Sequence, residues 1–303
     1  MSGQIALAAG TIAYEDTGGN GPAVVLLPGL LMDATLWSDV LRRLGPGVRC
    51  VVPTLPLGAH DTPVAPGADL SLAGQARIVA EFLERLELDD VTLVGNDTGG
   101  AIAQLVAGDA ELRRHVGRIV LVSCEAFDNV PPGLTGKTVV LSGRLPAPLF
   151  GLFVQQLRLK PIRRTPIAFG WLTKRGDATV ARWLRPVLTQ RAIRRDTMRV
   201  LRALHTDRDI LVDNAARLAT FDRPALIVWA SEDRVMPPEH GRRLAQLLPN
   251  AELVEIDDSY TLIPLDRPTA LANAIERFIH ATPFQTSTRI ASAEQPDVSR
   301  RPG

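Results

Sequence analysis

Short, mostly apolar runs alternate with segments of helical periodicity along most of the chain. These runs span 23–27, 48–52, 91–94, 119–122, 225–229 and 251–256. Runs without polar alternation are typical of parallel strands that are buried on both faces. Helical periodicity is clearest at 71–86, 239–248 and 268–279. The pattern therefore predicts an α/β fold with a mostly parallel, doubly wound sheet, which begins with a hairpin within residues 3–16.

The alternation stops between residues 131 and 205. Because this block falls between the sixth and seventh predicted strands, we expect it to be a helical cap inserted into the sheet-forming core. The core is then formed by residues 1–130 and 206–282. The last segment, 283–303, is rich in Ser, Thr, Pro, Gln and Arg without periodicity, so we expect it to be disordered.

Composition adds a few exclusions to this picture. The chain has 303 residues, 46% apolar and 22% charged, which is ordinary for a globular protein with a substantial core. No signal peptide and no membrane span is evident, and the two cysteines lie in apolar runs, so we expect a cytoplasmic protein with reduced thiols. Dinucleotide fingerprints, metal-ligand spacings and nucleic-acid modules are absent. We therefore expect a small-molecule substrate without cofactor, metal or nucleic acid, and leave the oligomeric state open.

Charge is distributed unevenly although the net charge is only +1. Between Leu141 and His205 the chain has fourteen Lys and Arg against two acids, so this segment is about +12 and the remainder about −11. Two interpretations stay open: a solvated arginine-rich surface that pairs with an acidic core, or attraction of an anionic substrate or partner. Apolar stretches at 149–154 and 167–172 predict an apolar roof over a pocket.

One stretch carries the candidate chemistry. The segment 94–101, VGNDTGGA, joins the apolar run 91–94 to a helical pattern, which is the arrangement of a nucleophile elbow. Gly95 and Gly99 leave room around the tight turn, and the following helix directs its N–H groups and positive dipole end at Asp97. A carboxylate is already ionised near pH 7, so Asp97 can attack carbon without a base. The alternative interpretation is a Gly-rich turn with a helix-capping aspartate.

Residues 10–281 resemble the α/β-hydrolase fold, and the aspartate elbow is similar to that of the haloalkane dehalogenase and epoxide hydrolase branch. The resemblance implies that Asp97 is the nucleophile and that the backbone N–H groups of Leu30 and Thr98 form an oxyanion hole. It also implies Asp233, which follows the strand 225–229, as the catalytic acid. Glu125 is a second candidate, because some dehalogenases place the acid one strand earlier.

The catalytic histidine of that branch is missing from the expected segment. In 258–264, DSYTLIP, Thr261 occupies the histidine position, and a threonine hydroxyl cannot act as a base near neutral pH. His60 is the best-placed alternative, because its loop usually borders the pocket mouth. Glu125 and Thr261 remain further candidates for pocket or acid–base residues, which makes the predicted triad degenerate.

Two other features of the branch are also absent. The two tyrosines, Tyr14 and Tyr260, lie outside the predicted cap, where epoxide hydrolases place ring-protonating tyrosines, and Thr98 replaces the halide-binding tryptophan of dehalogenases. The first hypothesis is an enzyme of the α/β-hydrolase type that acts on a small, largely apolar organic substrate, with Asp97 as nucleophile or general acid/base and Asp233 as second carboxylate. The alternative is an isomerase-, lyase- or cyclase-like enzyme, or a non-catalytic ligand-binding protein on the same scaffold.

Overall fold

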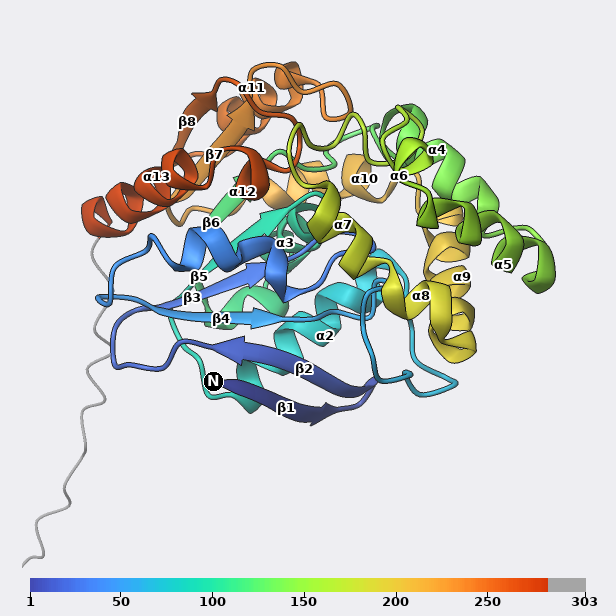
Figure 1. The fold of residues 1–303 in the computed structure, drawn as a ribbon. Helices are drawn as coiled ribbons and strands as arrows, with labels where there is room; N and C mark the ends of the chain where they lie inside the picture. Colours follow the sequence, from blue (N-terminus) through green and yellow to red (C-terminus); the bar gives the residue numbers. More distant parts are fainter. Residues whose placement is uncertain (283–303) are drawn as a thin grey trace, which may run out of the picture.

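An eight-stranded sheet forms the centre of the protein in the computed structural model, which describes residues 1–282 (Figure 1). The strands lie in the order β1-β2-β4-β3-β5-β6-β7-β8. Their bounds are Ser2–Leu7 (β1), Gly10–Asp16 (β2), Ala23–Leu27 (β3), Arg49–Pro53 (β4), Val91–Asn96 (β5), Val116–Val122 (β6), Ala225–Ala230 (β7) and Ala251–Ile256 (β8). The predicted mostly parallel sheet is confirmed: β1 and β2 form an antiparallel hairpin, β2 pairs antiparallel with β4, and all other pairs are parallel.

The central strands are buried on both faces, as continuous apolar runs require. Their register brings the ends of three strands to one edge of the sheet. Leu27 at the end of β3 pairs with Gly95 of β5, and Asn96 at the end of β5 pairs with Val122 of β6. Residues that follow these strand ends therefore lie beside one another.

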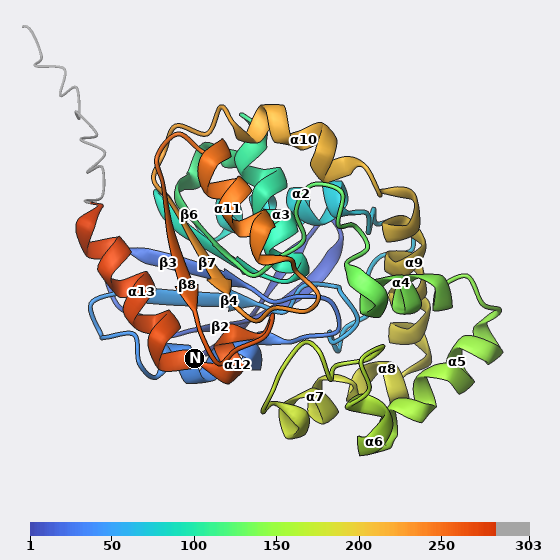
Figure 2. The same cartoon turned by 90° about the horizontal axis from the view of Figure 1, so that it is seen from above.

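Helices cover both faces of the sheet (Figure 2). Helices α2, α3, α10 and α11 pack on one face, and α1, α12 and α13 pack on the other (Figures 1 and 2). Their bounds, with two short 3₁₀ helices, are Ala34–Trp37 (η1), Ser38–Leu41 (α1), Leu72–Arg85 (α2), Thr98–Gly108 (α3), Leu112–His115 (η2), Ile210–Leu218 (α10), Pro238–Leu247 (α11), Ile263–Asp266 (α12) and Pro268–Ala281 (α13).

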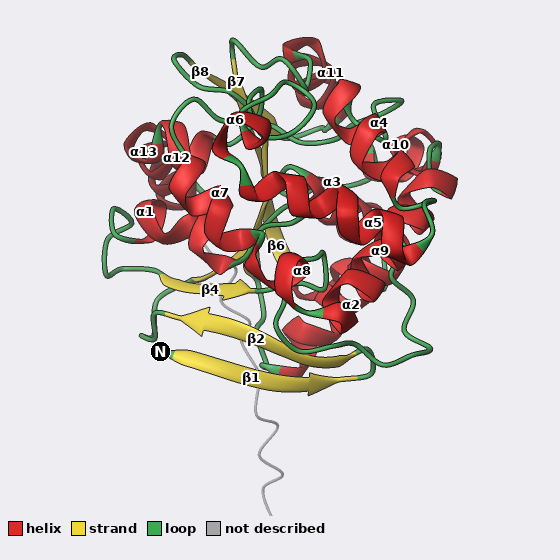
Figure 3. Ribbon diagram, turned by 45° about the vertical axis from the view of Figure 1, so that its right-hand side comes forward, coloured by secondary structure: helices red, strands yellow, loops and turns green. Residues whose placement is uncertain are grey.

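A run of helices, here called the helical insertion (residues 133–206), separates β6 from β7 along the chain. It comprises Gly133–Ser142 (α4), Ala147–Gln155 (α5), Gln156–Arg158 (η3), Lys160–Arg163 (α6), Asp177–Trp183 (α7), Arg185–Thr189 (α8) and Arg191–Thr206 (α9). The insertion lies at the side toward which the parallel strands point, and the described residues of this segment form helices and loops without a strand (Figures 1 and 3). The division of the chain into core and cap domains stays a prediction, and the tail predicted to be disordered lies outside the described residues.

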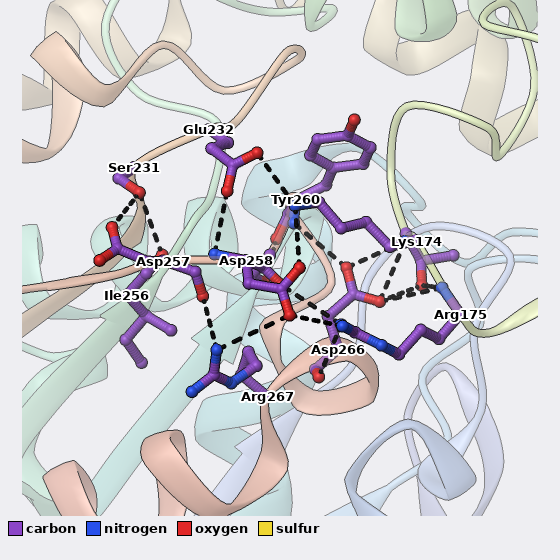
Figure 4. A network of polar contacts seen from close by, with 12 residues as sticks. Lys174, Arg175, Ser231, Glu232, Ile256, Asp257, Asp258, Tyr260, Asp266 and Arg267 are labelled. Atoms are coloured by element: carbon purple, nitrogen blue, oxygen red, sulfur yellow. Dashed lines mark hydrogen bonds and ion pairs between the residues drawn. The ribbon is translucent and has the colours of Figure 1, made fainter.

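An ionic cluster joins the insertion to the core (Figure 4). Lys174 Nζ lies 3.0 Å from Glu232 Oε2 and 3.2 Å from Asp258 Oδ1, and the Arg175 guanidinium pairs with the same Asp258. The Arg175 and Lys174 hydrogen bonds hold the pKa of Asp258 below its ordinary value. Asp266 accepts the backbone N–H groups of Lys174 and Arg175. The loop between α6 and α7 is thus tied to the loops that follow β7 and β8.

No helix among residues 1–282 is both long enough and apolar enough to cross a membrane.

Candidate active site

Asp97 lies at the tight turn between β5 and α3, with a φ of 54° and a ψ of −133°. A positive φ costs a non-glycine residue roughly 1–3 kcal/mol and is found at functional turns. The surrounding glycines permit this turn because backbone atoms fill the space that side chains would need. A Cβ at Gly95 would lie 2.3 Å from the Gly99 carbonyl oxygen, and a Cβ at Gly99 would lie 2.4 Å from the Leu27 carbonyl oxygen.

A cavity of about 130 Å³ separates the strand ends from the helical insertion, and Asp97 lines it. Thr98 and Glu125 are its other polar residues near the sheet. Most of the wall is apolar and comes from the insertion and from loops of the core, including Met32, Val139, Phe153, Leu157, Phe169 and Val235. No lysine, arginine or histidine among the described residues lines this cavity. The site is therefore a small apolar chamber with carboxyl groups at its inner end.

One oxygen of the Asp97 carboxyl is held by two donors. The backbone N–H of Leu30 lies 3.2 Å from Oδ1, and the Thr98 hydroxyl lies 3.1 Å from the same oxygen. Gly29 leaves the space that this carboxyl occupies, since a Cβ there would lie 2.3 Å from Oδ1. Neither of these two contacts involves Oδ2. The Leu30 N–H thus contacts the carboxyl of Asp97, and Thr98 adds both its backbone N–H and its side-chain hydroxyl to this environment.

Glu125 is linked to Asp97 through that same hydroxyl. Thr98 Oγ1 lies 2.8 Å from Glu125 Oε1, in addition to its contact with Asp97. A hydroxyl has one hydrogen, so both contacts are hydrogen bonds only if one carboxyl is protonated and donates to Oγ1. Burial raises the pKa of both carboxyls, and the charge of Asp97 raises the pKa of Glu125 further. Glu125 is therefore the member of the pair that keeps its proton, and the pair titrates as one unit.

Asp233 and Thr261 form a second polar contact behind this site. Asp233 Oδ1 accepts hydrogen bonds from the backbone N–H groups of Val235 and Met236, both at 2.9 Å, and from the Thr261 hydroxyl at 2.8 Å. Its other oxygen, Oδ2, is buried and has no hydrogen-bond partner within residues 1–282. Burial raises the pKa of Asp233 to about 6. The threonine at the histidine position thus touches the predicted acid but leaves one of its oxygens unsatisfied.

The side chain of Asn96 fixes the loops around the elbow. Its Nδ2 lies 2.9 Å from the Val122 carbonyl oxygen, 3.2 Å from that of Ser123 and 2.8 Å from that of Thr261. The last of these contacts holds the backbone at position 261 against the end of β5.

His60 does not line the cavity that contains Asp97. Its Nδ1 accepts the Gly58 N–H at 3.2 Å, and its Nε2 lies 3.8 Å from Asp196 Oδ2, outside the cavity lining. The other histidines are also elsewhere. They are His115 beside Asp89, His205 beside Arg144 and Arg208, His240 packed edge-on against Phe127, and the exposed His280. The structure therefore brings Asp97, Thr98 and Glu125 together without a histidine.

The link from Thr98 to Glu125 was missed in the sequence. Strand pairing was the signal that would have revealed it. Because β5 and β6 are parallel neighbours and Asn96 pairs with Val122, the residues that follow each strand emerge side by side. Thr98 and Glu125 lie two and three residues beyond this pair.

Comparison with known proteins extends this description. A family model described as alpha/beta hydrolase fold matches residues 22–268. Haloalkane dehalogenase 2 of Mycobacterium tuberculosis is 28% identical over 284 residues, which cover 89% of this chain and 92% of that protein. The 2-hydroxy-6-oxononadienedioate/2-hydroxy-6-oxononatrienedioate hydrolase of Burkholderia vietnamiensis is 28% identical over 250 residues, 80% of this chain and 81% of that protein. The structure of haloalkane dehalogenase DbeA from Bradyrhizobium elkani aligns with a TM-score of 0.74 at 19% identity, covering 93% and 98% of the two chains.

Proposed function

Since this chain belongs to the α/β-hydrolase fold family, we propose that it is an enzyme acting on a small, largely apolar organic molecule, with Asp97 as the reacting carboxylate. The cavity supports the substrate class. Its volume of about 130 Å³ is similar to that of an engineered apolar cavity of about 150 Å³ that binds benzene. Its apolar wall lacks a described cation that would hold an anionic substrate.

The reaction that the geometry supports best is proton transfer, as in an isomerisation or an elimination. The observation that carries it is the Thr98 hydroxyl, which contacts both Asp97 and Glu125 in a cavity that no described histidine lines. In this proposal ionised Asp97 removes a proton from a C–H bond of the substrate through Oδ2. Asp97 then returns this proton to another atom of the substrate, or exchanges it with solvent, and is ionised again. While Asp97 is ionised, the Glu125 proton can pass to Thr98 as the Thr98 proton passes to Asp97, so the pair shares one proton without movement of a heavy atom.

A second candidate is nucleophilic attack by Asp97 on carbon. The Leu30 N–H at Oδ1 favours it, because this donor would stabilise charge on that oxygen during formation and breakdown of an ester. Attack on an alkyl halide forms the ester and releases halide. Hydrolysis of the ester needs a base for water, and no described histidine lines the cavity. We therefore expect this reaction to stop at the ester, after each protein molecule has released one halide ion.

Replacement of Asp97 by Asn tests both candidates. The protein is incubated in D2O with small cyclic ketones, and exchange of the α-hydrogens is followed by NMR. We expect the parent to accelerate exchange and Asp97→Asn to reduce that rate by about 10²-fold or more, since the amide cannot accept the proton. The matched control is Asp213→Asn, which removes an exposed acid on α10.

Intact mass after incubation with alkyl bromides separates the second candidate from the first. An alkyl adduct on the parent that is absent from Asp97→Asn supports nucleophilic attack with stalled hydrolysis. If the protein produces neither exchange nor adduct but binds benzene saturably, the enzyme proposal is wrong and a ligand-binding function replaces it.

Glu125→Gln is expected to change the pH profile of the exchange reaction. In the parent, activity needs Asp97 ionised and Glu125 protonated. The rate therefore falls on the alkaline side as pH rises through the raised pKa of Glu125. Glutamine cannot ionise or pass on a proton. We therefore expect Glu125→Gln to reduce the exchange rate by about tenfold or more and to remove its decline at alkaline pH. A purely structural role for Glu125 would lower the rate without changing the profile.

The hydroxyl between the two carboxyls provides the matched pair for this experiment. Thr98→Ser keeps the hydroxyl and should keep the alkaline decline, whereas Thr98→Val keeps the shape of the side chain and should behave as Glu125→Gln does. Equal profiles for Thr98→Val and the parent would contradict the relay.

A further inference from the structure

Exposed apolar side chains are concentrated on one part of the helical insertion. Of the nine large hydrophobic residues that are exposed in residues 1–282, six lie between positions 134 and 167. Each is between 44% and 65% exposed, although single exposed apolar residues elsewhere are ordinary. The six are Leu134, Leu141, Leu149, Leu152, Leu159 and Ile167.

Helical spacing arranges most of these residues in two stripes. On α4, Leu134, Lys137 and Leu141 are exposed at intervals of three and four residues, and the exposed Arg144 follows the end of the helix. On α5, Leu149 and Leu152 are exposed at an interval of three residues, and the exposed Gln156 and Leu159 lie in η3 and directly after it. Such intervals put residues on one side of a helix. Two neighbouring helices of the insertion therefore each present an apolar stripe to solvent.

The charge of this region has one sign. No Asp or Glu occurs from residue 129 to residue 176. Lys137, Arg144, Arg158 and Lys160 are exposed and form no ion pair with the described residues. These cations do not line the cavity, so they are not there to hold a substrate in it. Together with the six exposed apolar residues they form a surface that we call the docking face.

The cavity opens onto this face. Most of its lining residues are buried or half-buried, and the two that are exposed, Gln156 and Ile167, both belong to the insertion. Gln156 lies in the α5–η3 stripe, and Pro166, beside Ile167, accepts the hydroxyl of Thr135 on α4. Helices α4 and α5, which contribute lining residues of the cavity, lie at the end of the sheet toward which the parallel strands point (Figures 1 and 2).

We propose that the docking face binds the surface of an anionic lipid bilayer, with the mouth of the cavity directed at the lipid. Its exposed leucines enter the boundary between headgroups and acyl chains, and its cations contact the anionic headgroups, which is the combination that peripheral membrane binding requires. The charge complementarity and the position of the mouth both favour this partner. Lipophilic molecules dissolved in the bilayer are then the substrate class, an assignment that rests on the proposed function, whereas lipid binding does not.

A fluorophore on the docking face tests the proposal directly. Cys50 and Cys124 are buried, so a thiol-reactive, environment-sensitive dye will label Leu152→Cys selectively. With vesicles of phosphatidylcholine and phosphatidylglycerol in equal amounts, we expect a blue shift of the dye that pure phosphatidylcholine vesicles do not cause. The matched control is Leu253→Cys on β8, which is exposed outside the insertion and should not respond. An equal response of both dyes, or of neither, contradicts the proposal.

Cosedimentation with the same anionic vesicles supplies the second measurement. We expect Arg158→Gln/Lys160→Gln and Leu149→Ser/Leu152→Ser each to reduce the ratio of bound to free protein by about tenfold. The charge-matched control is Arg217→Gln/Arg277→Gln, which removes two exposed cations outside the insertion, on α10 and α13. This control and Asp97→Asn should both bind the vesicles as the parent does. If Asp97→Asn loses catalysis but still binds the vesicles, the proposed catalytic role of Asp97 and the proposed lipid binding are shown to be independent. A blue shift of the Leu152→Cys dye without lipid, together with dimers in sedimentation velocity, would replace the bilayer by a second copy of the chain.

Discussion

Thr261→His is expected to convert a stalled alkyl ester of Asp97 into a hydrolysing one, with ester breakdown about 10²–10⁴-fold faster than in the parent. The backbone at position 261 is already held by Asn96 Nδ2 at 2.8 Å. Asp233 Oδ2 is buried without a partner among the described residues and is available to accept an imidazole N–H. A histidine at this position would therefore find the acid that orients it, and its other nitrogen could take a proton from water.

The measurement is the rate at which the alkyl adduct disappears from the intact mass spectrum after excess alkyl halide is removed. Thr261→Gln is the matched control, because it introduces a side chain of similar size that forms hydrogen bonds but cannot act as a base. Thermal unfolding of both variants checks that position 261, which is fully buried, accepts the larger side chain. If both folded variants lose the adduct at the parent rate, Asp97 and position 261 do not cooperate in ester hydrolysis.

Gly99→Ala is expected to reduce the free energy of unfolding by about 3 kcal/mol. The new Cβ would lie 2.4 Å from the carbonyl oxygen of Leu27 and 2.7 Å from that of Pro28, and both are backbone atoms that cannot rotate away. The elbow must shift away from β3 to relieve these contacts. We expect the thermal midpoint to fall by roughly 6 °C or more, as measured by differential scanning calorimetry.

Gly151→Ala is the control for this substitution. Gly151 also lies inside a helix, α5, but a Cβ there has no heavy atom within 4 Å. Alanine is favoured over glycine inside a helix by about 0.5–1 kcal/mol, so this variant should be slightly more stable than the parent. If Gly99→Ala and Gly151→Ala lowered the free energy of unfolding by similar amounts, the close approach of β3 to α3 would not limit stability.

Most of the sheet was predictable because its central strands are largely apolar. The strand at 251–256 was predicted with its observed bounds, whereas β6 begins at Val116 rather than at residue 119. Arg118 hid the first part of β6, because a cation inside a strand interrupts the apolar run. In the structure Arg118 is buried, and its Nε donates to the Thr282 carbonyl oxygen at 3.0 Å. Such a partner, 164 residues away, cannot be predicted from local pattern.

The site was predictable where a local motif carries it and not where it depends on contacts between strands. The elbow at Asp97 follows from its glycines and from the strand and helix on either side. The hydroxyl contact from Thr98 to Glu125 needs the pairing of β5 with β6, and the exclusion of His60 needs the position of Asp196 in the insertion. The roles of Asp97, Asp233, Leu30 and Glu125 stay predictions that the experiments above test.

The contact of Asn96 with the Thr261 carbonyl oxygen has a consequence for the history of this chain. It holds the loop through a backbone atom, so this particular contact does not depend on the side chain at position 261. A substitution at this position can therefore keep the contact that anchors the backbone to the end of β5. Selection on chemistry and selection on folding then act on different atoms of the same residue, and catalytic identity can change while the scaffold is inherited intact.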